Sequence, residues 1–237
     1  MTLENDALQA RFLKRLGDMG AEVKEYNEIK PTRGLAELDK DNIDGFTFHH
    51  TGVSDRPLVS HHNYHVNERG WVMAGYHFHI RPDGVIEVGR PVWARGAHSK
   101  NSNDFSLGVA FSGMFDREEP TPEQYEAGIQ IVKVAEELFD RKMEIWGHND
   151  FAETSCPGHK TDLDRIREGK TKDTGHDLTV KINNRKVNFP VKINEEGRTL
   201  VKLSNKWVQV REFVEMIPEA DISWDEDTRT VKIKIPE

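Results

Sequence analysis

Two histidines and the one cysteine of the chain have the residue types and the spacing that could do chemistry. His49 ends a short apolar segment, and His148 lies a few residues before Cys156. Two imidazoles and a thiolate are good zinc ligands, and three protein ligands leave a fourth position for water, as in catalytic zinc sites. Zinc in such a site lowers the pKa of water and polarises a carbonyl group. The spacing alone is equally compatible with Cys156 as a small buried filler and His148 as a loop residue.

A second group of histidines occupies positions 61, 62 and 65. His61 and His65 would lie on one face of a helix, because side chains at i and i+4 are neighbours there. A His-Glu-x-x-His zinc motif requires glutamate directly after the first histidine, and His62 occupies that position. The sequence therefore predicts no second metal site in this segment.

The elements that would position these residues alternate between strands and helices. The best-defined helix follows Thr121-Pro122-Glu123-Gln124, which provides an N-cap, a proline in the first turn and a capping-box glutamine. Strands are predicted at 45–50, 75–80, 85–89, 105–111 and 143–147. Apolar residues at helical spacing within 8–23 predict a helix that Gly20 would close, and a further helix is predicted at 58–68. Strands separated by helices indicate an α/β fold with a mixed central β-sheet flanked by helices.

A change in amino-acid composition near residue 167 indicates a division of the chain. Residues 167–177 are rich in Lys, Thr and Gly and are predicted to be a linker. Beyond it, strands are predicted at 178–182, 185–191, 199–203, 222–224 and 231–235, with one helix at about 210–217. We therefore expect two domains, 1–166 and 178–237, of which the second is a small α+β C-terminal domain.

The composition restricts the classes of protein. Asp and Glu number 41 against 33 Lys and Arg, and this net charge of -8 disfavours a nucleic-acid binder, which needs clustered basic residues. No apolar run approaches the roughly 20 residues of a membrane-spanning helix, so no membrane insertion is expected. A single cysteine excludes an intramolecular disulfide. The first residues lack the basic and apolar segments of a secretory signal, so we expect a protein that is cytoplasmic on synthesis.

Several ordered blocks carry a more specific signal. They are Phe48-His49-His50-Thr51, Arg69-Gly70-Trp71, Gly75-Tyr76-His77-Phe78, Asp83-Gly84, Gly96-Ala97-His98, Ser106-Leu107-Gly108-Val109, Gly147-His148 and Cys156-Pro157-Gly158. With these blocks the chain, from about Gly45 to His159, resembles the zinc-dependent N-acetylmuramoyl-L-alanine amidase family, which includes bacteriophage lysozyme-type amidases and peptidoglycan recognition proteins. Several blocks in the family order are far more specific than any one short motif.

The resemblance implies that His49, His148 and Cys156 bind Zn²⁺. Family members with cysteine at the last position are typically hydrolases, whereas recognition-only relatives tend to lack it. His50 remains an alternative first ligand, because adjacent strand residues point to opposite faces and only one of the pair can face the metal.

The resemblance also implies roles beside the metal. Tyr76 matches the family tyrosine near the zinc, where a phenol can hydrogen-bond the attacking water or the developing oxyanion. Thr154 occupies a position where members carry Lys or Thr, and its hydroxyl could donate to the tetrahedral intermediate. The candidate substrate contacts are His98, Arg95, Asn101 and Asn103. A structural role for His98 and solvated loop positions for the other three are the alternatives.

The segment after the linker carries a second resemblance. Arg198–Leu203, Val210–Phe213, Ile222–Asp225 and Thr230–Ile233 resemble the small domain found at the N-terminus of some copper amine oxidases. No histidine follows His176 and the segment has no cysteine, so nothing in it offers a copper site. Beside an amidase domain, its expected role is to hold the protein on the cell wall. Trp207 and Trp224 are candidates either for sugar stacking or for the core of this domain.

Together the resemblances predict a peptidoglycan hydrolase that cleaves the amide bond between N-acetylmuramic acid and L-alanine and needs no obligate protein partner. An amidase that has an accessory domain and no secretory signal resembles a phage or prophage endolysin, which acts on the cell wall after release. The alternatives are a cytoplasmic amidase that recycles muropeptides and a non-catalytic peptidoglycan receptor, for which a missing ligand is expected. A purely structural zinc site would need a fourth protein ligand, which we do not find in the sequence.

Overall fold

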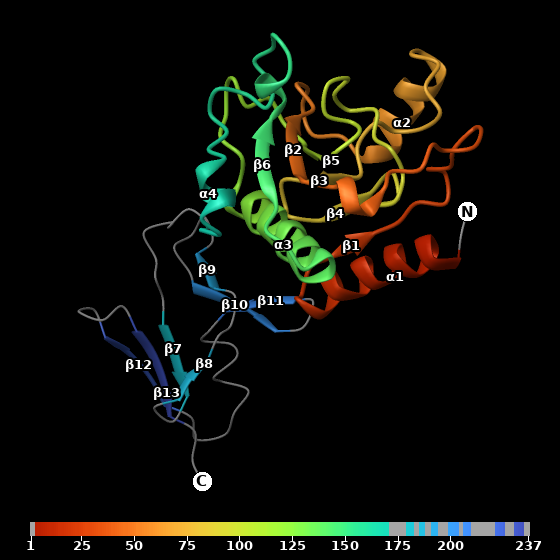
Figure 1. The fold of residues 1–237 in the computed structure, drawn as a ribbon. Helices are drawn as coiled ribbons and strands as arrows, with labels where there is room; N and C mark the ends of the chain where they lie inside the picture. Colours follow the sequence, from red (N-terminus) through yellow and green to blue (C-terminus); the bar gives the residue numbers. More distant parts are fainter. Residues whose placement is uncertain are drawn as a thin grey trace. The chain divides into compact units, whose positions relative to one another are not determined.

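The computed structural model of the chain describes residues 3–170 and, beyond them, the backbone of separate strands (Figure 1). The chain divides into two compact units, Met1–Lys172 and Asp173–Glu237. The boundary between the units falls inside the segment 167–177. All residues of the predicted site belong to the first unit.

The first unit is built on a six-stranded sheet with the strand order β1-β4-β3-β5-β2-β6. The strands are β1 (Val23–Lys24), β2 (Gly45–His50), β3 (Phe78–Ile80), β4 (Ile86–Val88), β5 (Ser106–Phe111) and β6 (Glu144–Gly147). The helices are α1 (Leu3–Asp18), α2 (Leu58–Asn67), α3 (Pro122–Phe139) and α4 (Asp164–Arg167), with short 3-10 helices η1 (Lys40–Asn42) and η2 (His148–Asp150). β3 and β4 pair antiparallel and the other neighbours in this sheet pair parallel. The mixed sheet flanked by helices is therefore confirmed.

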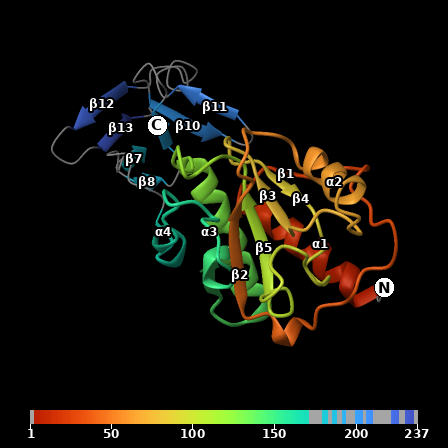
Figure 2. The ribbon, with the colours of Figure 1, turned by 90° about the horizontal axis from the view of Figure 1, so that it is seen from above.

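The central strands present an apolar face to α1 and α3. Phe46 and Phe48 of β2 and Phe111 of β5 are fully buried there, because alternate residues of a strand share one face. Phe12 of α1 and Leu16 of the same helix belong to this core cluster. Figure 2 shows α1 and α3 together beneath the strands of the sheet. This face is the main hydrophobic core of the unit.

The opposite face of the same strands carries polar side chains in one row. His49 of β2 is in register with Ala110 of β5, which is in register with His79 of β3. His79 in turn pairs with Glu87 of β4. The small Ala110 side chain therefore lies between two histidines on the face that α2 covers, where the Leu58 N–H at the start of α2 donates to the Glu87 carboxylate at 2.7 Å.

α1 begins earlier than the apolar spacing predicts and ends before Gly20. Glu4 and Asp6 lie in its first turn, where acidic side chains interact favourably with the helix dipole. Gly20 adopts a φ of 83°, which confirms it as the residue that closes the helix. Beyond Gly20, Val23 and Lys24 pair with β4 as strand β1, which the apolar spacing did not predict.

The N-terminus of α3 is fastened to the carboxyl ends of two strands. Thr121 Oγ1 accepts the Gln124 N–H at 3.1 Å, and Gln124 Oε1 accepts the Thr121 N–H at 3.0 Å, which confirms the predicted capping box. The Gln124 amide also donates to the carbonyls of Ile80 and Ser112 at 3.1 and 3.0 Å. One glutamine thus caps the helix and holds it against the ends of β3 and β5.

The second unit is described through its strands alone. They are β7 (Thr179–Ile182), β8 (Arg185–Val187), β9 (Val191–Ile193), β10 (Thr199–Leu203), β11 (Lys206–Gln209), β12 (Asp221–Asp225) and β13 (Thr230–Lys234). They form a three-stranded sheet, β11-β10-β9, and a four-stranded sheet, β12-β13-β7-β8. The strand predicted at 185–191 is divided into β8 and β9, and β11 was not predicted. The helix predicted at about 210–217 lies outside the described residues.

None of the helices in the described part of the chain combines the length and the hydropathy that spanning a membrane requires.

Candidate metal centre

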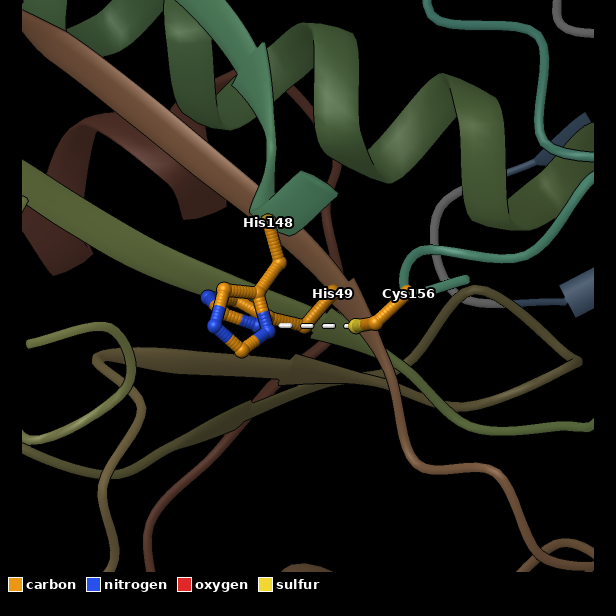
Figure 3. A group of neighbouring side chains, drawn as sticks. All are labelled: His49, His148 and Cys156. Atoms are coloured by element: carbon orange, nitrogen blue, oxygen red, sulfur yellow. Dashed lines mark hydrogen bonds between the residues drawn. The ribbon is translucent and has the colours of Figure 1, made fainter. Parts of the chain in front are cut away.

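Three side chains from separate parts of the chain meet at one edge of the sheet. His49 lies near the end of β2, His148 directly follows β6, and Cys156 lies in the loop after η2. Because β2 and β6 are parallel neighbours, their carboxyl ends reach the same edge, where open α/β sheets commonly place their sites. Figure 3 shows the two imidazole rings and the thiol gathered at one point.

The distances in this cluster are compatible with a shared ion. The donor atoms of His49, His148 and Cys156 all lie within 4.8 Å of one another. His49 Nδ1 is 3.6 Å from Cys156 Sγ, and the ring centroids of His49 and His148 are 4.6 Å apart. Within the described residues, no other group of three His, Cys, Asp or Glu side chains meets this geometry. The structure thus brings the three predicted ligands together, and metal binding itself stays a prediction.

The choice between His49 and His50 follows from the alternation of β2. His49 is 1% exposed and points into the cluster. The His50 side chain is engaged elsewhere, since its Nδ1 accepts the Phe115 N–H at 3.2 Å. The backbone N–H of His50 nevertheless donates to Cys156 Sγ at 3.4 Å. His49 is therefore the member of the pair that faces the metal centre.

Burial determines the protonation of the cluster in the absence of an ion. It lowers the pKa of His49 well below the usual 6.5 and also lowers that of His148, so both rings are neutral near pH 7 and keep a lone pair for a metal. Burial raises the pKa of the Cys156 thiol to about 11. A thiolate at this position therefore needs a positive charge beside it, and a divalent cation would supply that charge. The donor set fits a cation that prefers nitrogen and sulfur ligands.

Tyr76 and Thr154 lie beside the cluster on different segments. The Tyr76 ring centroid is 5.3 Å from that of His49. Burial, with the charge of Cys156, raises the pKa of Tyr76, so its phenol stays protonated and can donate a hydrogen bond at neutral pH. Thr154 is exposed, and its Oγ1 accepts the Cys156 N–H at 3.2 Å. That contact leaves the Thr154 hydroxyl hydrogen available to a ligand.

The four candidate substrate contacts have different surroundings. Arg95 forms an ion pair with Asp104, and the Asn101 amide donates to the Phe151 carbonyl at 2.8 Å. Asn103 is buried, and its Oδ1 accepts the backbone N–H groups of His98 and Ser99, each at 3.0 Å. Contact of these residues with a substrate stays a prediction.

His98 contacts the candidate metal centre, and this contact was not predicted from the sequence. Its Nδ1 is 3.1 Å from His49 Nε2, and its ring is buried beneath the cluster. The sequence offers only the presence of Gly96 and Gly108 near His98 as a signal. In the structure, a Cβ at Gly108 would lie 2.5 Å from the His98 ring, and one at Gly96 would lie 2.4 Å from it. These distances show that the two glycines make room for the ring.

Comparison with known proteins identifies the family of this site. Residues 39–159, a little more than half of the chain, match the family model described as N-acetylmuramoyl-L-alanine amidase. The chain belongs to this amidase family. The matched range contains all three clustered residues of the candidate metal centre.

Individual relatives of this amidase-family chain include endolysins and recognition proteins. It is 36% identical to the endolysin of Enterobacteria phage K11 over 116 residues, which are 46% of this chain and 75% of the phage protein. It is 34% identical over 98 residues to peptidoglycan-recognition protein LB of Drosophila melanogaster, covering 40% of this chain and 42% of the fly protein.

Among solved structures, the endolysin N-acetylmuramoyl-L-alanine amidase LysCS from Clostridium intestinale URNW has a similar fold, with a TM-score of 0.56 and 29% identity. The similarity covers 62% of this chain and 94% of the clostridial chain. By contrast, the chain spans less than two thirds of the first curated relatives it matches, at 42% and 62% of their lengths.

Proposed function

We propose that the protein hydrolyses the amide bond between N-acetylmuramic acid and the L-alanine of the peptidoglycan stem peptide, and that it does so as a zinc enzyme. The observation that carries the proposal is the convergence of His49, His148 and Cys156 within 4.8 Å in an amidase-family chain. A thiolate and two neutral imidazoles favour Zn²⁺ over cations that prefer oxygen ligands.

The number of ligands supports a catalytic rather than a structural ion. The described residues provide three donors at the cluster, and catalytic zinc sites typically use three protein ligands and keep one open position. Zinc bound there would supply a Lewis acid that lowers the pKa of water and polarises the scissile carbonyl group. The three side chains would hold the ion at the open edge of the sheet.

Tyr76 and Thr154 are proposed to stabilise the oxyanion that forms when water attacks the lactyl carbonyl. Two donors from opposite segments can hold one developing oxygen in a preorganised arrangement. The neutral Tyr76 phenol and the Thr154 hydroxyl both offer an O–H at the cluster. When the amide bond breaks, the alanine nitrogen leaves as an amine and takes up a proton that the attacking water has released.

The biological role that we propose is that of a phage or prophage endolysin acting on the cell wall. The similarity to the K11 endolysin over 75% of its length supports this role. The second unit is proposed to be an accessory domain that holds the enzyme on the wall, a role that its place in the same chain as an amidase-family unit supports. A recycling amidase has less use for such a domain.

Metal removal and restoration is the direct test of the proposal. The protein is incubated with purified peptidoglycan, and the products are analysed by mass spectrometry. We expect free stem peptides that begin with L-alanine, their loss after treatment with a chelator, and their return when Zn²⁺ is added, because the ion is required for the chemistry. The absence of new reducing sugar ends is the control that separates an amidase from a glycosidase. Binding of intact muropeptides without release of stem peptides under every zinc condition would favour a receptor instead.

Replacing Tyr76 with phenylalanine is expected to lower the turnover rate by about 100-fold to 1,000-fold, which is the usual cost of losing one oxyanion donor. Zinc affinity should stay at the wild-type value, because the phenol is not a ligand. Rates of stem-peptide release and zinc affinity from chelator competition provide the two measurements. Tyr64→Phe is the matched control, since Tyr64 is 50% exposed on α2. Equal rates for the Tyr76 variant and wild type would show that the Tyr76 hydroxyl does not stabilise the oxyanion.

A further inference from the structure

His98 lies directly behind one ligand of the candidate metal centre. Its Nδ1 is 3.1 Å from His49 Nε2, whereas the other ring nitrogen of His49, Nδ1, lies 3.6 Å from Cys156 Sγ. The two rings meet edge to face, with an angle of 74° between their planes. On its other side, His98 Nε2 lies 3.2 Å from the Ser106 carbonyl oxygen. The Ser106 carbonyl, His98 and His49 form a continuous chain of hydrogen bonds from the backbone of β5 to the ligand.

The chemistry of these groups determines where each proton lies. A carbonyl oxygen can only accept, so the hydrogen bond to Ser106 requires a proton on His98 Nε2. A neutral imidazole carries a single N–H, which in His98 is then the one on Nε2. Its Nδ1 is then an acceptor, and the proton in the contact with His49 belongs to His49 Nε2. The remaining His49 nitrogen, Nδ1, keeps its lone pair and lies 3.6 Å from Cys156 Sγ.

The His98 ring is held in the orientation that this chain of hydrogen bonds requires. Asn103 Oδ1 accepts the backbone N–H groups of His98 and Ser99, which fixes the loop. The ring fits against Gly96 and Gly108, where any added Cβ would approach it to 2.4 or 2.5 Å. With 8% of its surface exposed, His98 has both ring nitrogens engaged inside the protein.

We infer that His98 is a positioning residue of the metal centre, which fixes His49 in the tautomer whose Nδ1 lone pair faces the ion. Which nitrogen of a ligand histidine is free for a metal is set by the hydrogen bond that its other nitrogen makes. Here the accepting group is a second histidine, whose own tautomer is set by the Ser106 carbonyl. The inference rests on the proposed function only in taking the ion to be zinc.

The tautomer itself can be measured without metal or substrate. In metal-free wild-type protein near pH 7, ¹⁵N and ¹H NMR of the histidine rings should show His49 protonated on Nε2 and unprotonated on Nδ1. The same spectra should show His98 protonated on Nε2. A wild-type spectrum with the His49 proton on Nδ1 would overturn the inference, and this measurement needs no variant to fold.

Two substitutions of similar shape at His98 distinguish the effect of the hydrogen-bond acceptor from the effect of side-chain packing. His98→Asn keeps an oxygen near the place of Nδ1, whereas His98→Leu fills a similar volume without an acceptor. We expect Zn²⁺ affinity, measured by competition with a chromophoric chelator, to fall about 10-fold to 100-fold in His98→Leu. The asparagine variant should bind Zn²⁺ close to the wild-type level. Equal loss in both variants, or no loss in either, would overturn the inference.

A Co²⁺-substituted sample provides a spectroscopic check on the same pair. The visible absorption bands of Co²⁺ report the ligand set, so they should be kept in His98→Asn and changed in His98→Leu. None of these readouts depends on hydrolysis. A protein with the predicted His49 tautomer that releases no stem peptides would therefore contradict the proposed function and leave the role of His98 intact.

Discussion

Replacing Cys156 with serine is expected to reduce the release of stem peptides by about 100-fold or more, since loss of even an indirect partner of a metal costs about 10-fold to 100-fold in affinity. Cys156 offers the one soft ligand of the cluster, at 3.6 Å from His49 Nδ1. A serine hydroxyl stays neutral and is a harder, weaker donor for zinc. Release rates from mass spectrometry and zinc content after dialysis give the two measurements.

The same loop provides a matched control for this substitution. Glu153 is exposed and lies close to Cys156 in the chain, outside the three-residue cluster. Glu153→Gln should therefore retain both the wild-type rate and the wild-type zinc content. A serine variant of Cys156 that is as active and as zinc-rich as wild type would show that the thiol is not a ligand.

The grouping of His49, His148 and Cys156 could be predicted because metal-ligand chemistry depends on residue type. Strands were expected at 45–50, which contains His49, and at 143–147, directly before His148, and parallel strands bring their carboxyl ends together. The choice between His49 and His50 was not open to prediction from alternation alone. It depends on which face of β2 is covered by the apolar core, and that is decided by Phe46 and Phe48.

The contact between His98 and His49 could not be predicted, because it joins a loop to a strand 49 positions away in the chain. Spacing rules describe neighbours along one helix or strand, whereas this pair depends on tertiary packing. The strand at Val23 was not predicted for a related reason. Val23 continues the apolar pattern of the helix, but pairing with Ile86 of β4 places it in a strand.

Glu87 is the clearest case of a residue whose surroundings the sequence conceals. It lies between Ile86 and Val88 in β4, a position that alternation alone would assign to a solvated face. In the structure it is 1% exposed, because α2 and the segment around Tyr26 cover that face. Its hydrogen-bond partners come from distant parts of the chain, so no local sequence pattern predicts them.

Replacing Glu87 with glutamine is expected to lower the free energy of unfolding of the first unit by about 3–5 kcal/mol, as when one partner of a buried ion pair is removed. The carboxylate accepts the Tyr26 hydroxyl, the Leu58 N–H at 2.7 Å and His79 Nδ1–H at 2.8 Å. A glutamine amide would turn an N–H₂ group toward some of these donors. Urea unfolding at pH 7 measures the loss, and Glu28→Gln on the exposed surface is the control.

The pH dependence of this difference tests its cause. Burial alone would raise the pKa of Glu87, but the hydrogen bonds from His79, Tyr26 and Leu58 outweigh it and lower the pKa from 4.5 to about 2. A carboxylate whose pKa is lower in the folded state stabilises the protein above its unfolded pKa, and this contribution disappears as the pH falls toward the folded pKa. The stability gap between wild type and Glu87→Gln should therefore narrow between about pH 4.5 and pH 2. A gap that is as wide at pH 3 as at pH 7 would mean that lost packing, rather than lost charge, explains the effect, because packing does not titrate.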